Sequence, residues 1–130
     1  MIVVDVNLLL YASFATFAQH EAARGWFEKA LNGDEQLLLP GVSVFGFVRI
    51  ATNPRVFEKP LRVGDALDVV ESWLEQPHVH FLVPGPRHVE IAFRLLRDLG
   101  AARNLATDVQ LAAHASETQA VLCSNDSEVA

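Results

Sequence analysis

The opening run Ile2-Val3-Val4 places three consecutive apolar residues directly before the carboxylate of Asp5. A strand that is apolar at every position, without alternation, is typical of a parallel sheet covered on both faces. Asp5 then lies at the carboxyl end of the strand, the edge of an open α/β sheet where ligands bind. Two interpretations stay open at this point: Asp5 caps a helix that begins near Asn7, or it belongs to a functional site.

The rest of the chain alternates helical and strand patterns, which predicts an α/β fold, and its 130 residues fit a single domain, 1–130. The segment 42–50 is ambiguous, and we favour a helix because it runs into Ala51-Thr52-Asn53-Pro54. Hydrophobic spacing and turn residues predict helices over 19–31, 42–50, 63–74, 86–99 and 104–115, and short strands over 36–39, 80–83 and 120–123.

Helical spacing also predicts which side chains face inward. In the helix over 63–74 they are Val63, Ala66, Leu67, Val70 and Leu74, and in the helix over 86–99 they are Val89, Ala92, Phe93 and Leu96. His114 falls off the apolar stripe of its helix, so we expect it to be exposed.

The charge of the chain is unevenly placed. A net charge of −6 argues against nucleic acid as a partner, yet residues 49–103 hold eight of the ten Lys and Arg residues. Residues 104–130 contain four carboxylates and no Lys or Arg. Those carboxylates need solvent, a metal ion or an arginine from elsewhere in the chain.

Composition also limits where the protein works. The hydrophobic share of 51% is high for so short a chain and leads us to expect an apolar oligomer surface, such as that of a homodimer. No apolar stretch is long enough to cross a bilayer, so we expect no membrane association. The single cysteine and the absence of a signal-peptide pattern predict a cytoplasmic protein.

Two further carboxylates lie at positions that could bring them to Asp5. Asp108 follows Asn104, a possible N-cap, by one turn, and Asp126 follows the strand over 120–123 much as Asp5 follows the first strand. Asp108 could serve only the helix dipole, but its place in an apolar stripe favours a site. Three converging carboxylates would select a hard cation, Mg²⁺ or Mn²⁺, whose natural chemistry is phosphoryl transfer.

At this point the sequence resembles the PIN-domain family, and within it the VapC-type endoribonuclease toxins of bacterial toxin–antitoxin modules. The resemblance is carried by four segments spanning nearly the whole chain: Val4-Asp5-Val6-Asn7-Leu8-Leu9-Leu10-Tyr11-Ala12, Phe47-Val48-Arg49-Ile50-Ala51-Thr52-Asn53-Pro54, Asn104-Leu105-Ala106-Thr107-Asp108 with Leu111-Ala112-Ala113, and Leu122-Cys123-Ser124-Asn125-Asp126. It implies a three-layer α/β/α sandwich on a mostly parallel sheet of four or five short strands. It also implies Mg²⁺- or Mn²⁺-dependent cleavage of RNA, homodimerisation and inhibition by a VapB-like antitoxin, with DNA contacted only through that antitoxin.

Carried over position by position, the resemblance implies that Asp5, Asp108 and Asp126 are the catalytic, metal-binding acids. Ser124 matches a small hydroxyl residue that often precedes the last of these acids. The resemblance implies weaker, supporting roles for Asn7 and Asn104. Arg49 belongs to the arginines that would guide RNA towards the acidic cleft.

The sequence departs from the family pattern at two places. Gly46 stands where many relatives have a glutamate, so one metal ligand is missing, and Glu128 could partly replace it. Relatives also tend to continue with a further strand beyond position 130. These departures keep a second function open, that of a catalytically weak PIN-like protein that binds RNA or an antitoxin. A haloacid-dehalogenase-type phosphatase would need a second aspartate at position 7, where this chain has Asn7.

Overall fold

The computed structural model describes residues 1–100 and 105–124. The elements in these ranges follow the predicted alternation of strand and helix, and segment 42–50 is helical, as favoured above. In chain order they are β1 (Ile2–Val4), α1 (Val6–Ser13), α2 (His20–Leu31), β2 (Leu37–Pro40), α3 (Gly41–Ala51), α4 (Val63–Leu74), β3 (Val79–Leu82), α5 (His88–Leu99), α6 (Leu105–Thr118) and β4 (Val121–Cys123).

The four strands form one parallel sheet in the order β3-β2-β1-β4. Strand β1 therefore lies inside the sheet, with Val3 opposite Leu38 of β2 and opposite Leu122 of β4. A strand with neighbours on both edges and helices on both faces has little contact with water, which explains its uninterrupted apolar run. The predicted parallel sheet is confirmed.

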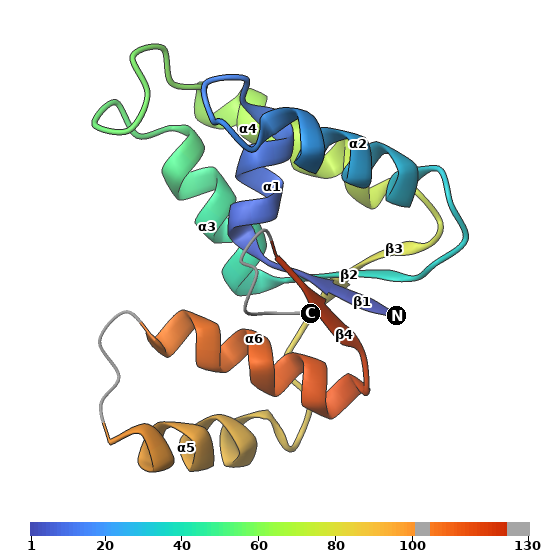
Figure 1. Cartoon of the computed structure of the whole chain (residues 1–130), viewed down its shortest axis with the longest axis vertical. Coiled ribbons are helices and arrows are strands. Elements are labelled where there is room, and N and C mark those ends of the chain that lie inside the picture. Colours follow the sequence, from blue (N-terminus) through green and yellow to red (C-terminus); the bar gives the residue numbers. More distant parts are fainter. Residues whose placement is uncertain (101–104, 125–130) are drawn as a thin grey trace.

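The helices cover the two faces of the sheet unequally (Figure 1). Helices α1 to α4 lie on one face, and α5 and α6 lie on the other, with α6 against the sheet and α5 against α6. The strand residues alternate accordingly: Val4 and Leu39 pack under α1 to α4, whereas Val3 and Leu38 pack against Leu111 of α6. The predicted three-layer α/β/α sandwich is confirmed.

The larger half of the core is built around Phe47 of α3, whose side chain is fully buried. Its ring lies 5.0 Å from Trp73 of α4 and 6.2 Å from Phe14, measured between ring centroids. Phe14 in turn contacts Phe57 at 4.4 Å. These rings join α3, α4 and the loops that follow α1 and α3 into one apolar unit.

The prediction of which residues of α4 and α5 face inward is partly wrong. Ala66 and Val70 of α4 are buried as predicted, but Val63 and Leu67 are exposed, and Trp73 is buried in their place. In α5 only Ala92 of the predicted set is buried, while Val89 and Phe93 are more than half exposed. The reason is that α5 packs through a narrow stripe against the small residues of α6 instead of against the wide face of the sheet.

Within residues 1–100 and 105–124, no helix combines the length and the apolar character needed to cross a membrane.

Candidate active site

Asp5 lies at the carboxyl end of β1, where the chain turns from the sheet into α1. It is 93% buried, since only 7% of its surface is exposed. Its backbone occupies the N-cap position of α1, but its side chain makes no capping hydrogen bond. The capping interpretation is therefore wrong, and the interpretation of Asp5 as part of a functional site remains a prediction.

The peptide group before Asp5 is fixed by a buried serine that the sequence reasoning missed. The Ser43 hydroxyl of α3 donates a hydrogen bond of 2.7 Å to the carbonyl of Val4, and Ser43 is almost fully buried. On the other side, the backbone N–H of Asp5 donates to the carbonyl of Cys123 at 3.0 Å. Asp5 is thus held between α3 and β4, which limits the positions its carboxylate can reach. The sequence feature that could have identified Ser43 is its position as a single serine within the apolar run Val42-Ser43-Val44.

Ser124 is brought to the same edge by the pairing of β1 with β4. Val4 is opposite Cys123 in the parallel register, so Asp5 and Ser124 each directly follow one residue of the same pair. Ser124 is half-buried and lines a pocket of about 190 Å³ together with Trp26 of α2 and Leu8 of α1. Two residues distant in sequence, 5 and 124, are therefore neighbours at the carboxyl edge.

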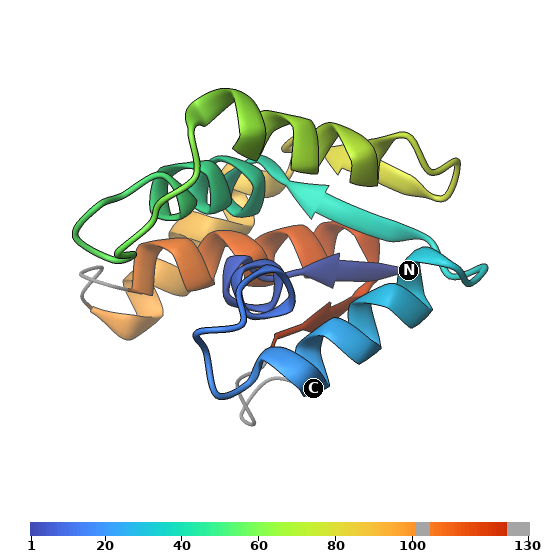
Figure 2. The same ribbon diagram turned by 90° about the horizontal axis from the view of Figure 1, so that it is seen from above.

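Asp108 approaches from the helix that covers the other face of the sheet. It lies in the first turn of α6, is exposed, and lines a pocket of about 270 Å³ between α5 and α6 together with Asp98. Figure 2 shows that α6 begins on the side towards which the strands point and packs across β1 and β4. The first turn of α6, which carries the exposed Asp108, thus lies towards the carboxyl edge of the sheet, where Asp5 is buried.

The other predicted site residues fall into two groups. Asn7 is exposed in the first turn of α1, and Arg49 is exposed in the last turn of α3. Asn104, Asp126 and Glu128 lie outside the described residues, so the structure is silent on their place. Among residues 1–100 and 105–124, no group of three or more His, Cys, Asp or Glu side chains is arranged to hold a metal ion.

Gly46, at the position where the resemblance implies a glutamate, lies where α1 and α3 approach closely. A Cβ atom added at Gly46 would be 3.1 Å from Cγ2 of Val6, closer than ordinary van der Waals contact. Val6 is the residue directly after Asp5, so this contact lies beside the candidate site. A glutamate at position 46 would require Val6 to shift.

A second buried polar cluster lies between α5, α6 and the loop after β3. His88 and His114 are both buried, with ring centroids 4.3 Å apart. Among the described residues, neither Nδ1 atom has a hydrogen-bond partner. The expectation that His114 is exposed is therefore wrong, because the loop after β3 and α5 cover the side of α6 that carries it.

Glu117 belongs to this cluster and forms two hydrogen bonds that fix the start of α5, here called the Glu117 clasp. Its carboxylate accepts hydrogen bonds from the backbone N–H groups of Gly85 and Arg87, both at 2.9 Å. The hydrogen bond from Arg87 is the main cause that lowers the pKa of Glu117, opposed by burial, and the bond from Gly85 lowers it further. Burial, followed by the neighbouring His88, lowers the pKa of His114, and Glu117 opposes that shift.

Comparisons with known proteins agree with this architecture. The PIN domain family model matches residues 2–130. Ribonuclease VapC33 of Mycobacterium tuberculosis is 47% identical over 130 residues, which is 100% of this chain and 91% of that protein. VapC ribonuclease Mb2897 of Mycobacterium bovis is 40% identical over 126 residues, covering 97% of this chain and 86% of that protein.

Solved structures show the same fold at low sequence identity. The crystal structure of Mycobacterium tuberculosis VapC20, a Sarcin-Ricin loop cleaving toxin, superposes with a TM-score of 0.73 at 14% identity, over 98% of this chain and 92% of that one. VapBC2 from Rickettsia felis, bound to a DNA fragment from its promoter, gives a TM-score of 0.61 at 15% identity, over 97% of this chain and 88% of that one. From the family match and the full-length identity to VapC ribonucleases, the chain belongs to the PIN-domain family, among its VapC ribonucleases.

Proposed function

We propose that this protein is an endoribonuclease toxin that hydrolyses RNA phosphodiester bonds with a divalent cation and is neutralised by a VapB-like antitoxin. The observation that carries the proposal is the 47% identity to Ribonuclease VapC33, which extends over the whole chain. The buried carboxylate of Asp5 at the ligand-binding edge of the sheet supports it independently.

In this proposal Asp5, Asp108 and Asp126 hold Mg²⁺ or Mn²⁺. The donors are carboxylate oxygens, which hard cations prefer. A bound cation of this kind supplies an activated water and stabilises the negative charge that develops on the phosphate. Asp5 is suited to a fixed ligand, because Ser43 and Cys123 both hydrogen-bond to the peptide group that precedes it.

The remaining candidates support the site or the substrate. Ser124 follows the strand residue paired to Val4, and this register supports a contact between Ser124 and the ligand that Asp5 binds in this proposal. Arg49 is exposed and would attract the RNA backbone. We assign Asn7, Asn104 and Glu128 supporting roles around the acids, with Glu128 as a partial replacement for the glutamate that Gly46 displaces.

The proposed partners are a VapB-like antitoxin and a second copy of this chain, in the cytoplasm. The solved VapBC2 complex of Rickettsia felis, which shares this fold, supports the antitoxin. The exposed large apolar side chains, including Phe45, Phe93 and Val89, support a surface that another chain covers. DNA would be contacted only through the antitoxin.

A second function is favoured by one observation. Gly46 removes a ligand present in many relatives, and its tight contact with Val6 leaves no room for an acid there without a shift. A protein that lacks this ligand could bind RNA or an antitoxin without cleaving RNA. Calorimetric titration with Mn²⁺ separates the two functions, since the absence of binding near millimolar metal favours the binding protein.

The test of the leading function is cleavage of RNA with Mg²⁺ or Mn²⁺ and with EDTA. We expect Asp5→Asn and Asp108→Asn to lower the cleavage rate by about 100-fold or more. Asp65→Asn is the matched control for Asp108→Asn, because Asp65 is also exposed in the first turn of a helix. Cleavage undiminished by Asp5→Asn would refute the assignment.

A further inference from the structure

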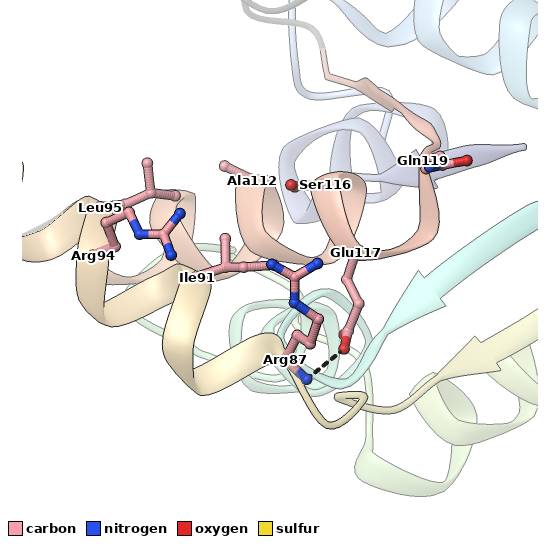
Figure 3. A pocket seen from close by; sticks show the side chains of 8 residues that line it. All are labelled: Arg87, Ile91, Arg94, Leu95, Ala112, Ser116, Glu117 and Gln119. Atoms are coloured by element: carbon pink, nitrogen blue, oxygen red, sulfur yellow. Dashed lines mark hydrogen bonds between the residues drawn. The ribbon is translucent and has the colours of Figure 1, made fainter.

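A pocket of about 410 Å³ lies between α5 and α6, on the face of the sheet opposite α1 to α4 (Figure 3). Its volume is within the range of small-ligand sites. Arg87 and Arg94 form the wall on the α5 side, and Ser116 and Gln119 lie on the α6 side. The pocket thus combines cationic groups with neutral hydrogen-bonding groups.

Both arginines of the pocket are exposed, and their ion pairs are exposed as well. Both pair with a single exposed carboxylate, Glu90, at 3.9 Å from Arg87 and 3.1 Å from Arg94. Glu117 also lines the pocket, but its oxygens accept hydrogen bonds from the backbone of Gly85 and Arg87. An incoming phosphate can replace Glu90 at the guanidinium groups without breaking a buried interaction.

The floor of the pocket is apolar, formed by side chains such as Ile91, Leu95 and Ala112. An apolar floor under arginines and hydroxyl or amide groups fits a nucleotide, whose base is flat and apolar on its faces and polar at its edges. The hydroxyl of Ser116 and the amide of Gln119 can hydrogen-bond to a base edge or to a ribose.

The pocket continues towards Asp108, one of the three acids of the proposed site. The neighbouring pocket lined by Asp108 shares Leu95 and Ala112 with it, so the two form one groove along the seam between α5 and α6. One end of this groove has Asp108, and the other has Arg87. A strand lying in the groove would reach both ends.

We propose that the α5–α6 pocket binds a nucleotide of the RNA strand, with its base on the apolar floor and its phosphates in contact with Arg87 and Arg94. This inference rests on the proposed ribonuclease function and adds the surface that positions the substrate. Arg87 and Arg94 are positioning residues, because they lie along the groove from Asp108. The Glu117 clasp contributes by fixing the backbone of Arg87 against α6.

The experiment measures binding of a fluorescein-labelled single-stranded RNA of mixed sequence, about 20 nucleotides long so that it exceeds the site of one small domain. Fluorescence anisotropy is recorded with Asp5→Asn protein, to suppress cleavage, at several salt concentrations. Into this background we introduce Arg87→Gln and Arg94→Gln, singly and together. Thermal unfolding checks that each variant folds.

The chain offers a closely matched control in Arg24→Gln. Arg24 pairs with Glu28 at i,i+4 and 2.8 Å, just as Arg94 pairs with Glu90 at i,i+4 and 3.1 Å. The exposed fractions of the two arginine side chains are 61% and 63%. Arg24 lies on α2, on the opposite face of the sheet (Figure 1).

We expect each pocket variant to weaken binding about three- to tenfold and to lower the salt slope, log Kd against log salt concentration, by about 0.7. Arg24→Gln should change neither quantity. Equal affinity and slope for the double variant and the control would overturn the inference, as would a parent protein that does not bind the probe.

Wild-type cleavage of the same RNA with Mn²⁺ separates this inference from the proposed function. Cleavage by the wild type, together with binding that is insensitive to Arg87 and Arg94, would refute the pocket and leave the ribonuclease function standing. Binding that depends on both arginines, without cleavage by the wild type, would support the pocket and refute the proposed function.

Discussion

The imidazole rings of His88 and His114 lie with their centroids 4.3 Å apart in the buried space where α5, α6 and the loop after β3 meet. Two neutral rings are compatible with such contact, but a protonated ring would bring an ionic charge into a buried site beside another titratable ring. Glu117 is the anionic group near this pair, and it is already engaged by two backbone N–H groups. The stability of the packing between α5 and α6 should therefore depend on pH.

Acid should destabilise the fold through His114. Burial and His88 lower its folded pKa below the ordinary 6.5, so below that pH the unfolded chain binds more protons than the folded one. The contribution of the neutral ring is complete above pH 6.5 and is lost as the pH falls. Urea unfolding between about pH 8 and pH 5.5 should show a smaller pH slope for His114→Phe than for wild type.

The matched control for the acid prediction is His80→Gln, because His80 is exposed on β3. The pH slope of His114→Phe should be smaller than that of this control. If His114→Phe retains the full wild-type slope, the histidine pair is not the source of the acid sensitivity.

Gly85→Ala should destabilise the protein. A Cβ at Gly85 would overlap the carboxylate of Glu117, with its Cδ only 2.6 Å away, and would displace the clasp on α5. We expect a loss of about 1–3 kcal/mol in the free energy of unfolding, measured by urea denaturation.

Gly25→Ala is the control for this substitution. Gly25 is exposed inside α2, and nothing lies within 4 Å of the position that an added methyl group would take, so alanine should stabilise by about 1 kcal/mol through helix propensity. Destabilisation by both alanines would point to a general intolerance of added side chains and not to the clasp.

Ser43→Ala should cost about 1–3 kcal/mol, because the carbonyl of Val4 loses its buried donor. The comparison is Ser72→Ala, whose hydroxyl donates to the Val69 carbonyl on the exposed side of α4 and whose loss should stay within about 0.5 kcal/mol. RNA cleavage should also slow in Ser43→Ala, since the peptide before Asp5 loses a restraint. Wild-type stability in Ser43→Ala would show that this hydrogen bond is not important to the fold.

Gly46→Glu, which introduces the acid common in relatives, should destabilise by about 1–3 kcal/mol through its contact with Val6. Val6→Ala removes the contacting Cγ2 atom and should relieve part of that loss. A double-mutant cycle on thermal unfolding should therefore give a favourable coupling of at least about 0.5 kcal/mol. Strict additivity would mean that the close approach of α1 and α3 is not what excludes a side chain at 46.

The sequence was sufficient to predict most of the fold, and the failures have a common physical cause. The unalternating run Ile2-Val3-Val4 predicted a central parallel strand, which β1 is. Hydrophobic spacing located α4 and α5 but not their buried residues, because an apolar stripe does not reveal which element covers it. Phe93 is apolar yet more than half exposed, while the neighbouring Ala92 is buried against α6.

The candidate site was predicted in part for similar reasons. Asp5 stood out because a carboxylate after a buried strand is costly, and the structure places it buried at the sheet edge. The contacts that hold it, from Ser43 and Cys123, depend on long-range pairing that no local pattern reveals. The roles of Asp108 and Asp126 stay predictions, and the contact of His88 with His114 required the packing of α5 on α6 to be known.

The pairing of β1 with β4 has a consequence for synthesis of the protein. Residues 2–4 leave the ribosome early, but their partner Val121–Cys123 is translated more than a hundred codons later. Until then β1 has one open edge, and the neighbourhood of Asp5 and Ser124 does not exist. The sheet edge that carries Asp5 and Ser124 is therefore completed only after residue 124 has been synthesised.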